Sequence, residues 1–459
     1  MSEAPLEERL VAHLVRLATS TPQRETRERL AHAILDWFTA GWSGQTMALA
    51  PSIESVTQLT WPGGGTAPTF GGKRLAPVAA GFCNAAVAHL REIDDAHRTA
   101  MLHPGVIAVS PVIALSSSHS LTRHQVMAGI LAGYEVSLRI GEALGPQHAA
   151  RFHATATAGT VGAAAAAGIA LGLTPGQLHH ALGIASTQAA GLWQLADDDA
   201  HESKSLHPGF AVRNGMMAAF LAQAGLPGAH AFLTGPRAMY ALLNGGGQLE
   251  AITHELDGPA KLHTATIKAW PSCAMTFTAL DALQSLVSST GMNTVDIVSV
   301  HVEIFSHALK IANVDWPHKS SETPFSIRYL LAALLHHGQL GISEVETPAL
   351  DDEALRALGA RVKVVPSEAL QQAFPERRPA VVTVEMADGR RLSARRELRR
   401  GDPEDPFTWD QLLERMRAFA PAMDDGTATA LATWCHTLTD PSQDDQRCQP
   451  DAALFGPVI

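Results

Sequence analysis

The chain is short of charged and aromatic residues. Charged residues make up 17% of its 459 residues and aromatic residues 5%. Lys and Arg number 34 against 45 Asp and Glu, the net charge is −11, and no long basic run occurs. Because phosphate binding needs clustered Lys and Arg, nucleic acid is excluded as the main partner. An anionic small molecule stays open, since one pocket can be locally positive in an acidic protein.

Cysteine is also scarce. The four cysteines never form a C-x-x-C motif, so we expect no zinc or iron–sulfur site; they are Cys83, Cys273, Cys435 and Cys448. The start, MSEAPLEERL, is acidic and lacks the apolar core of a signal peptide. We therefore expect a cytoplasmic protein with reduced thiols. No glycine-rich phosphate loop, G-x-S-x-G elbow or H-E-x-x-H motif stands in a convincing context.

One segment tests whether the chain enters a membrane. Residues 154–173, ATATAGTVGAAAAAGIALGL, carry no charge and are about as long as a membrane span. Ala and Gly gain little on transfer to lipid, however, and Arg151 and His153 stand at the entrance. The sequence predicts a buried helix in a globular core, where small residues let neighbouring backbones approach closely.

Apolar periodicity predicts a helical first part of the chain. Residues 5–42 read as two amphipathic helices with a break near Thr21-Pro22, and 43–78 read as loop because Gly, Pro, Ser and Thr dominate. Thr174-Pro175 is a typical helix start. The remaining expected helices are 79–91, 105–117, 122–144, 154–172, 175–193 and 208–225.

The pattern changes near residue 265. The runs 294–305, 361–365 and 380–397 alternate and are β-branched, and the last is a hairpin turning at Asp388-Gly389. Helices are expected at 276–289, 325–337, 350–358 and 408–437. The predicted fold class is α+β: a large all-helical domain built from both chain ends plus a smaller α/β domain. The expected domains are 1–265, 266–400 and a C-terminal helical segment, 401–459, that rejoins the first.

Four polar groups interrupt the apolar background. Three of them place Lys or His shortly before an apolar helix, where unpaired N–H groups and a partial positive charge favour carboxylates. The implied ligand is a small organic acid, and the implied chemistry is proton transfer beside a carboxylate. The groups are 92–103 (Glu92, Asp94, Asp95, His97 and His103), R-F-H at 151–153, KSLHPG at 204–209 and KAWPSCAMTF at 268–277.

Each of these residues also has an ordinary structural interpretation. Asp94 and Asp95 suit helix caps or turns, Lys204 suits the surface, and a histidine at a helix start is commonly structural. His97, beside Arg98, is expected in a solvent-facing loop. Composition and spacing alone therefore predict a helix-rich protein with a candidate site for a carboxylate, and nothing more specific.

Taken together, the segments resemble the MmgE/PrpD family over nearly the whole chain. The matching pieces are EIDDAHRTAMLHPG, FHATATAGTVGAAAAA, KSLHPGFAVRNG, KAWPSCAMTF, PFSIRYLLAALL and MADGRRLSARRELRRGDPEDP. The family includes 2-methylcitrate dehydratase, cis-aconitate decarboxylase and iminodisuccinate epimerase. The resemblance implies the two-domain fold described above, a homodimer, and activity without a metal or organic cofactor.

The resemblance also implies site residues. By position, the candidate catalytic residues are His103, His153, Lys204 and Tyr329. The candidate substrate-binding residues are Glu92, Asp94, Asp95, His207, Ser272 and Phe277. In the family the matched residues line one pocket at the domain junction.

The chain departs from the family pattern at several positions. Glu92 replaces an Asp, Ala96 stands where Thr is frequent, and Phe277 replaces a histidine. One extra residue lies between Asp95 and His103. Since Phe277 exchanges a potential cation for an apolar ring, we expect a substrate with fewer carboxylates or with a more apolar group.

The resulting hypothesis is a cofactor-free lyase for a small di- or tricarboxylic acid. Lys204 and a helix start would hold a carboxylate, and His103 or His153 would act as acid or base, as suits an imidazole near neutral pH. Tyr329 would bind substrate or move a proton, and the two aspartates would orient the histidines or the loop. Family frequency places a 2-methylcitrate dehydratase-like activity first, with decarboxylase and epimerase close behind. A member that binds an organic acid without turnover is the alternative of another class.

Overall fold

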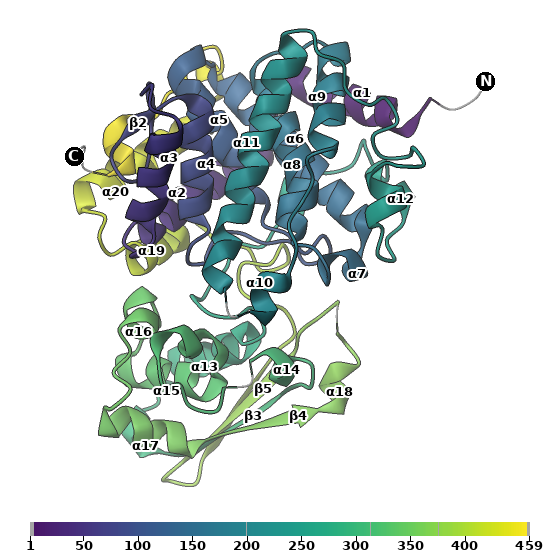
Figure 1. The fold of residues 1–459 in the computed structure, drawn as a ribbon. Helices are drawn as coiled ribbons and strands as arrows, with labels where there is room; N and C mark the ends of the chain where they lie inside the picture. Colours follow the sequence, from purple (N-terminus) through teal and green to yellow (C-terminus); the bar gives the residue numbers. More distant parts are fainter. Residues whose placement is uncertain (1–3, 199, 313, 375, 457–459) are drawn as a thin grey trace. The chain divides into compact units, whose positions relative to one another are not determined.

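The computed structural model describes residues 4–198, 200–312, 314–374 and 376–456 (Figure 1). The chain divides into two compact units, Met1–Thr266 with Ala422–Ile459, and Ile267–Pro421. The first unit is helical and draws on both chain ends, while the second combines helices with a sheet. The α+β class expected from the sequence is confirmed.

Long helices build the first unit. Four helices at its centre bury nearly all of their residues, and they are α4 (Pro77–Ala88), α5 (Pro104–His119), α6 (Arg123–Leu144) and α8 (Ala154–Ala170). Helix α11 (Leu206–Gln223) packs against α4 and α8 and buries about half of its residues. Further helices pack around them: α1 (Leu6–Thr19), α2 (Arg24–Gly44), α3 (Ala50–Thr60), α9 (Pro175–Ser186) and α20 (Asp425–Thr437). Short pieces complete the unit: α7 (Pro146–Ala149), α10 (Gln194–Asp197), α12 (Met239–Leu243), β1 (Ala67–Pro68) and β2 (Arg74–Leu75).

Small residues explain how the central helices fit together. Every residue of α8 is buried, as expected for this uncharged segment. A Cβ added at Gly133 of α6 would lie 2.6 Å from Ala108 Cβ, and one at Gly162 of α8 would lie 2.7 Å from Ser137 Cβ. These contacts are too short for any larger side chain, so Gly and Ala permit the close packing. No helix in the described part of the chain has both the length and the apolarity that crossing a bilayer requires.

Helix α3 lies where the sequence was expected to form loop. Pro51 occupies the first turn of the helix, where a proline is tolerated because its missing N–H has no intrahelical partner to lose. Glu54 and Thr57 are buried on its inner side, and Glu54 accepts a hydrogen bond from the Thr69 hydroxyl. Tertiary contacts thus stabilise a helix that the Ser- and Thr-rich composition conceals.

The second unit contains a four-stranded sheet of order β4-β3-β5-β6. Its strands are β3 (Ile297–Phe305), β4 (Val362–Ser367), β5 (Ala380–Met386) and β6 (Arg391–Arg396). β3 pairs with β4 in parallel, and the other pairs are antiparallel. The hairpin expected at Asp388-Gly389 is confirmed, and Gly389 has the positive φ of 84° that this turn favours.

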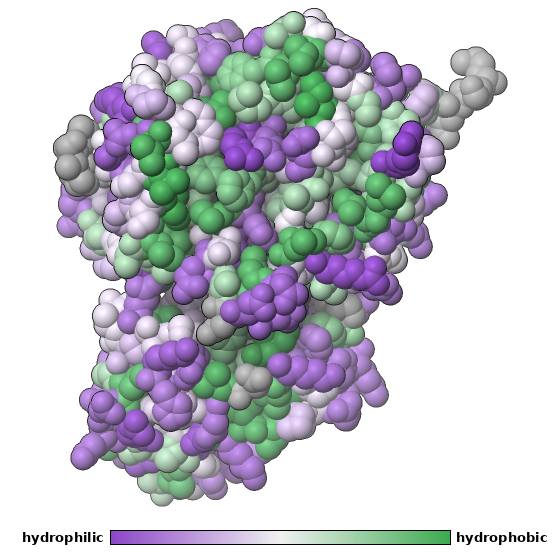
Figure 2. All heavy atoms as spheres, viewed as in Figure 1, coloured by the Kyte–Doolittle hydropathy of each residue, from purple (hydrophilic) through white to green (hydrophobic). Residues whose placement is uncertain are grey.

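Helices cover one face of this sheet (Figure 1). They are α13 (Phe277–Thr290), α15 (Ile327–His337) and α17 (Glu353–Arg361), with α19 (Trp409–Phe419) and the short α14 (Ala308–Ile311), α16 (Ile342–Glu346) and α18 (Glu368–Gln371) elsewhere in the unit. The helix expected over 408–437 is two helices, because Pro421 lies in the break between α19 and α20. On the visible face, hydrophilic residues surround separate hydrophobic patches (Figure 2).

Candidate functional site

The carboxylate of Asp94 lies between two imidazoles in the first unit. Nδ1 of His89 lies 3.1 and 3.0 Å from its two oxygens, and Nδ1 of His103 lies 3.1 Å from Oδ2. His89 and Asp94 are fully buried, and the His103 side chain is 12% exposed. Burial alone would raise the pKa of Asp94, but His89 and His103 hold that pKa well below its usual range. Asp94 is therefore ionised and can accept a hydrogen bond from the Nδ1–H of each ring.

Helix ends bring three histidines together. His103 occupies the position just before α5, His153 the position just before α8, and His89 the position just after α4. The backbone N–H of His103 donates to Oγ1 of Thr155, 3.1 Å away in the first turn of α8, which fixes the two helix starts side by side. Ring centroids lie 4.5 Å apart for His89 and His103, 5.7 Å for His89 and His153, and 6.2 Å for His103 and His153. We call His89, His103 and His153 the histidine cluster.

His153 has a second imidazole neighbour. Its Nδ1 lies 3.1 Å from Nδ1 of His207, in the first turn of α11, so one ring donates and the other accepts. Burial, followed by the charge of Lys204, lowers the pKa of His153 well below its usual value. Burial and nearby His89 and Lys204 lower the pKa of His207 to about 4. Both rings are thus neutral near pH 7, and each can donate one hydrogen bond and accept another.

Lys204 supplies the positive charge beside these rings. It precedes α11 in the 3₁₀ turn His201–Ser205, and its side chain is only 10% exposed. Its Nζ lies 2.5 Å from Oε2 of Glu92, whose side chain is 48% exposed. Glu92 has a φ of 54°, a left-handed conformation that is unfavourable for a residue with a Cβ. The buried ammonium group of Lys204 is therefore paired with the carboxylate of Glu92, whose backbone is in an unfavourable conformation.

Asp95 serves a different purpose from Asp94. Its carboxylate accepts from the Gly105 N–H at 2.7 Å and from the Tyr134 hydroxyl at 2.6 Å, and its backbone N–H donates to Asp36 at 2.9 Å. Burial, followed by the charge of Asp36, raises the pKa of Asp95 to about 7. A Cβ at Gly105 would lie 2.7 Å from Asp95 Oδ1, so the glycine permits the contact. Asp95 anchors the start of α5 and hence the backbone that carries His103.

Three candidate residues belong to the second unit. Tyr329 is buried in its core, and its hydroxyl donates to the carbonyl of Glu344 while burial raises its pKa. Phe277, the first residue of α13, is fully buried. Oγ of Ser272 lies 2.9 Å from Oγ1 of Thr276. The first unit thus gathers the other candidates, which are Glu92, Asp94, Asp95, His103, His153, Lys204 and His207.

Sequence reasoning missed His89. It lies five residues before Asp94 at the end of an apolar helix, and this spacing places its ring against the carboxylate. An imidazole closing an Ala-rich helix just ahead of an acid pair was the available signal. The expectation for His97 was wrong: it is 6% exposed, because its ring bonds to Thr264 and to the N–H of Ala100.

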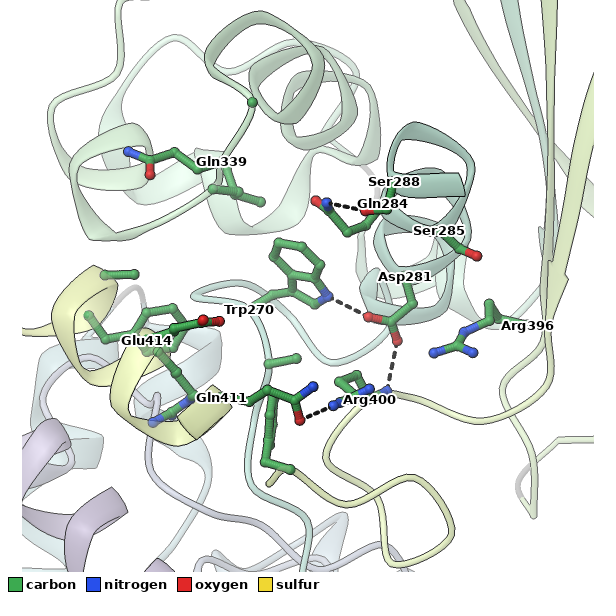
Figure 3. Close-up of a pocket in the computed structure, with 17 residues that line it drawn as sticks. Trp270, Asp281, Gln284, Ser285, Ser288, Gln339, Arg396, Arg400, Gln411 and Glu414 are labelled. Carbon is green, nitrogen blue, oxygen red and sulfur yellow. Dashed lines mark hydrogen bonds between the residues drawn. The ribbon is translucent and has the colours of Figure 1, made fainter. Parts of the chain in front are cut away.

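The second unit has a cavity of its own, about 750 Å³ in volume. Trp270 Nε1 and the backbone N–H of Arg400 both donate to Asp281, at 2.8 Å each, and the Arg400 side chain donates to Gln411 (Figure 3). Burial raises the pKa of Asp281 to about 6. These contacts give Asp281 and the Arg400 side chain structural partners within the second unit, and the histidine cluster is the stronger candidate site.

Comparison with known proteins agrees with this fold. The family model for the MmgE/PrpD N-terminal domain matches residues 8–252, and that for the C-terminal domain matches residues 270–433. The chain belongs to the MmgE/PrpD family, and it is a lyase.

The chain is similar to proteins named as cis-aconitate decarboxylases. The chain is 27% identical over 436 residues to a cis-aconitate decarboxylase of Aspergillus terreus, covering 89% of this chain and 88% of that protein. It is 26% identical over 425 residues to the cis-aconitate decarboxylase of Homo sapiens, covering 86% and 84%. A carboxylic acid substrate fits these relatives.

Proposed function

We propose that the chain decarboxylates an unsaturated tricarboxylic acid of the cis-aconitate type. The observation that carries the proposal is the meeting of an ionised Asp94, two imidazoles oriented by it, and a buried lysine within one unit. The names of the relatives support decarboxylation over the dehydration that family frequency placed first.

Binding begins at Lys204. A substrate carboxylate replaces Glu92 on the ammonium group, an exchange of one anion for another that leaves the buried charge compensated. The starts of α5 and α8 add partial positive charge close by. Because His153 and His207 are neutral, they add no positive charge beside Lys204 that would hold the anionic product in the site.

The chemical step breaks one carbon–carbon bond. Carbon dioxide leaves from one carboxylate, and its bonding electron pair stays on the carbon, spread over the adjacent double bond and a remaining carboxylate. Protonation of that carbon completes the reaction and yields an unsaturated dicarboxylic acid. His103 donates the proton, because Asp94 orients its ring and stabilises a positive charge on it.

His153 has a supporting role in this scheme. Its pKa is held low, so it stays neutral: its Nδ1 accepts from His207, and its other ring nitrogen donates an N–H to the substrate carboxylate. Tyr329 receives no chemical role, because its hydroxyl already donates to a backbone carbonyl in the second unit.

The decisive experiment follows the reaction by proton NMR in deuterated water. Incubation with cis-aconitate should release carbon dioxide and give a dicarboxylic acid carrying one deuterium on carbon. A parallel panel of 2-methylcitrate and amino-dicarboxylic acids tests dehydration and epimerisation. Turnover that survives both His103→Ala and Lys204→Ala would contradict the site assignment. Binding of an organic acid without turnover of any panel member would favour a non-catalytic role.

Two further features belong to this proposal. The family resemblance implies a homodimer, and we propose a cytoplasmic location. Light scattering coupled to gel filtration measures the mass in solution, and microscopy of a tagged chain gives the location. A monomer with full activity would show that the site needs no second copy.

A further inference from the structure

The histidine cluster has the composition of a transition-metal site. One ring nitrogen from each of His89, His103 and His153 lies within 4.8 Å of the other two, all in the helical unit. Imidazole nitrogen is a preferred ligand of Zn²⁺, Co²⁺ and Cu²⁺. Metal–nitrogen bonds of about 2.0–2.1 Å set nitrogens about 3.4 Å apart in a tetrahedral site, so small ring movements complete it.

The surroundings of the cluster match the second shell of metal-binding histidines. Such histidines commonly donate one ring N–H to a carboxylate, which leaves the other nitrogen for the ion. Asp94 provides this carboxylate for His89 and lies beside Nδ1 of His103 as well. Nε2 of His89 is fully buried and has no hydrogen-bond partner among the described residues. A lone pair on that nitrogen is available to an ion.

The charge balance also permits a divalent cation. The carboxylate of Asp94 lies beside the cluster, 3.0 Å from Nδ1 of His89 and 3.1 Å from Nδ1 of His103, and Glu92 pairs with the nearby ammonium group of Lys204. A neutral imidazole is the form that binds metal, and His153 is buried. Its contact with Nδ1 of His207 parallels the second-shell contact that Asp94 makes with His89.

We propose that the histidine cluster binds one divalent transition-metal ion, with Zn²⁺ as the representative, and that this ion excludes the organic acid. Binding requires only the three rings. The exclusion rests on the proposed function, since it follows from the ion occupying His103 and His153, the residues assigned to substrate. The site would therefore make the enzyme sensitive to free zinc rather than dependent on it.

Binding is measured first, without any substrate. The full chain is stripped with a chelator and titrated with Zn²⁺ by calorimetry and with Co²⁺ by visible absorption. We expect one ion per chain and the absorption of a low-coordinate Co²⁺ site. His89→Phe should weaken binding at least about tenfold, and Asp94→Asn about 10- to 100-fold. His179→Phe is the matched control, because its ring lies 5.2 Å from His230 in a separate histidine group.

Two results would overturn the metal site: no stoichiometric binding by the wild type, or equal affinity in His89→Phe and His179→Phe. Should His89→Phe fail to fold, NMR of the wild type with ¹⁵N-labelled histidine decides, since Zn²⁺ must shift nitrogens of three imidazoles. Inhibition is tested separately with cis-aconitate, where zinc should raise the apparent KM. Zinc binding without decarboxylation defeats the proposed function alone, and decarboxylation without zinc binding defeats the metal site alone.

Discussion

Oδ2 of Asp94 lies 3.1 Å from Nδ1 of His103, and the carboxylate is fully buried. The two residues are separated by a loop before α5 that turns back on itself at residues 97–102, so the contact depends on how that loop folds. Because the pKa of Asp94 is held low, the pair joins an anion to an imidazole rather than two neutral groups.

Replacing this anion tests whether it supports proton donation. Asp94→Asn keeps the size of the side chain but removes its charge, so His103 loses orientation and charge stabilisation. We expect kcat for decarboxylation to fall about 10²- to 10⁴-fold, the usual contribution of a positioned acid. Steady-state kinetics measure the change. Asp95→Asn is the control, and an equal loss in both variants would mean that the effect is structural.

Removing the buried ammonium group tests substrate binding. Lys204→Met should raise KM for cis-aconitate about 10- to 100-fold, since a hydrogen bond to a charged group contributes about 1.5–3 kcal/mol. Lys261→Met removes a comparable ion pair, 2.6 Å from Glu142 in the same unit, and should leave KM unchanged. An unchanged KM in Lys204→Met would place the carboxylate elsewhere.

Glu92 competes with substrate for the same lysine, so its charge should weaken binding. Glu92→Gln removes the competing anion, and we expect KM to fall up to about fivefold, because a half-exposed ion pair contributes about 1 kcal/mol or less. Kinetics at several salt concentrations show whether the gain disappears on screening. A raised KM would instead show that Glu92 positions Lys204.

Asp95 should make stability depend on pH. Its pKa is raised to about 7, so the folded protein holds a proton that the unfolded chain releases near pH 4. This contribution is complete below pH 4 and is lost as pH rises to 7. Relative to wild type, Asp95→Asn should therefore gain stability across that window, by up to about 4 kcal/mol. Urea unfolding at successive pH values measures the difference, and a constant difference would refute the raised pKa.

Replacing Tyr329 tests whether its hydroxyl has a structural role or a chemical one. Tyr329→Phe leaves the Glu344 carbonyl without its buried donor, so we expect a loss of about 1–2 kcal/mol in the free energy of unfolding and an unchanged kcat. Thermal unfolding and kinetics on one preparation give both values. A tenfold lower kcat with unaltered stability would give Tyr329 the chemical role that the family resemblance implies.

Local patterns determined much of this protein. Apolar periodicity predicted most helices, alternation and Asp388-Gly389 predicted the hairpin, and the small residues of 154–173 predicted a buried helix. These features depend on neighbours along the chain, which is why one sequence suffices. The family motifs also indicated His103, His153 and Lys204 as site residues.

Only the tertiary structure decided what surrounds those residues. His89 closes one helix while His103 and His153 begin two others, and no local rule says that these helix ends meet. The adjacent acids look alike in sequence, yet the fold turns Asp94 toward imidazoles and Asp95 toward Tyr134 and Asp36. The charge of each group follows from burial and from neighbours distant in sequence, and the packing of helices creates both.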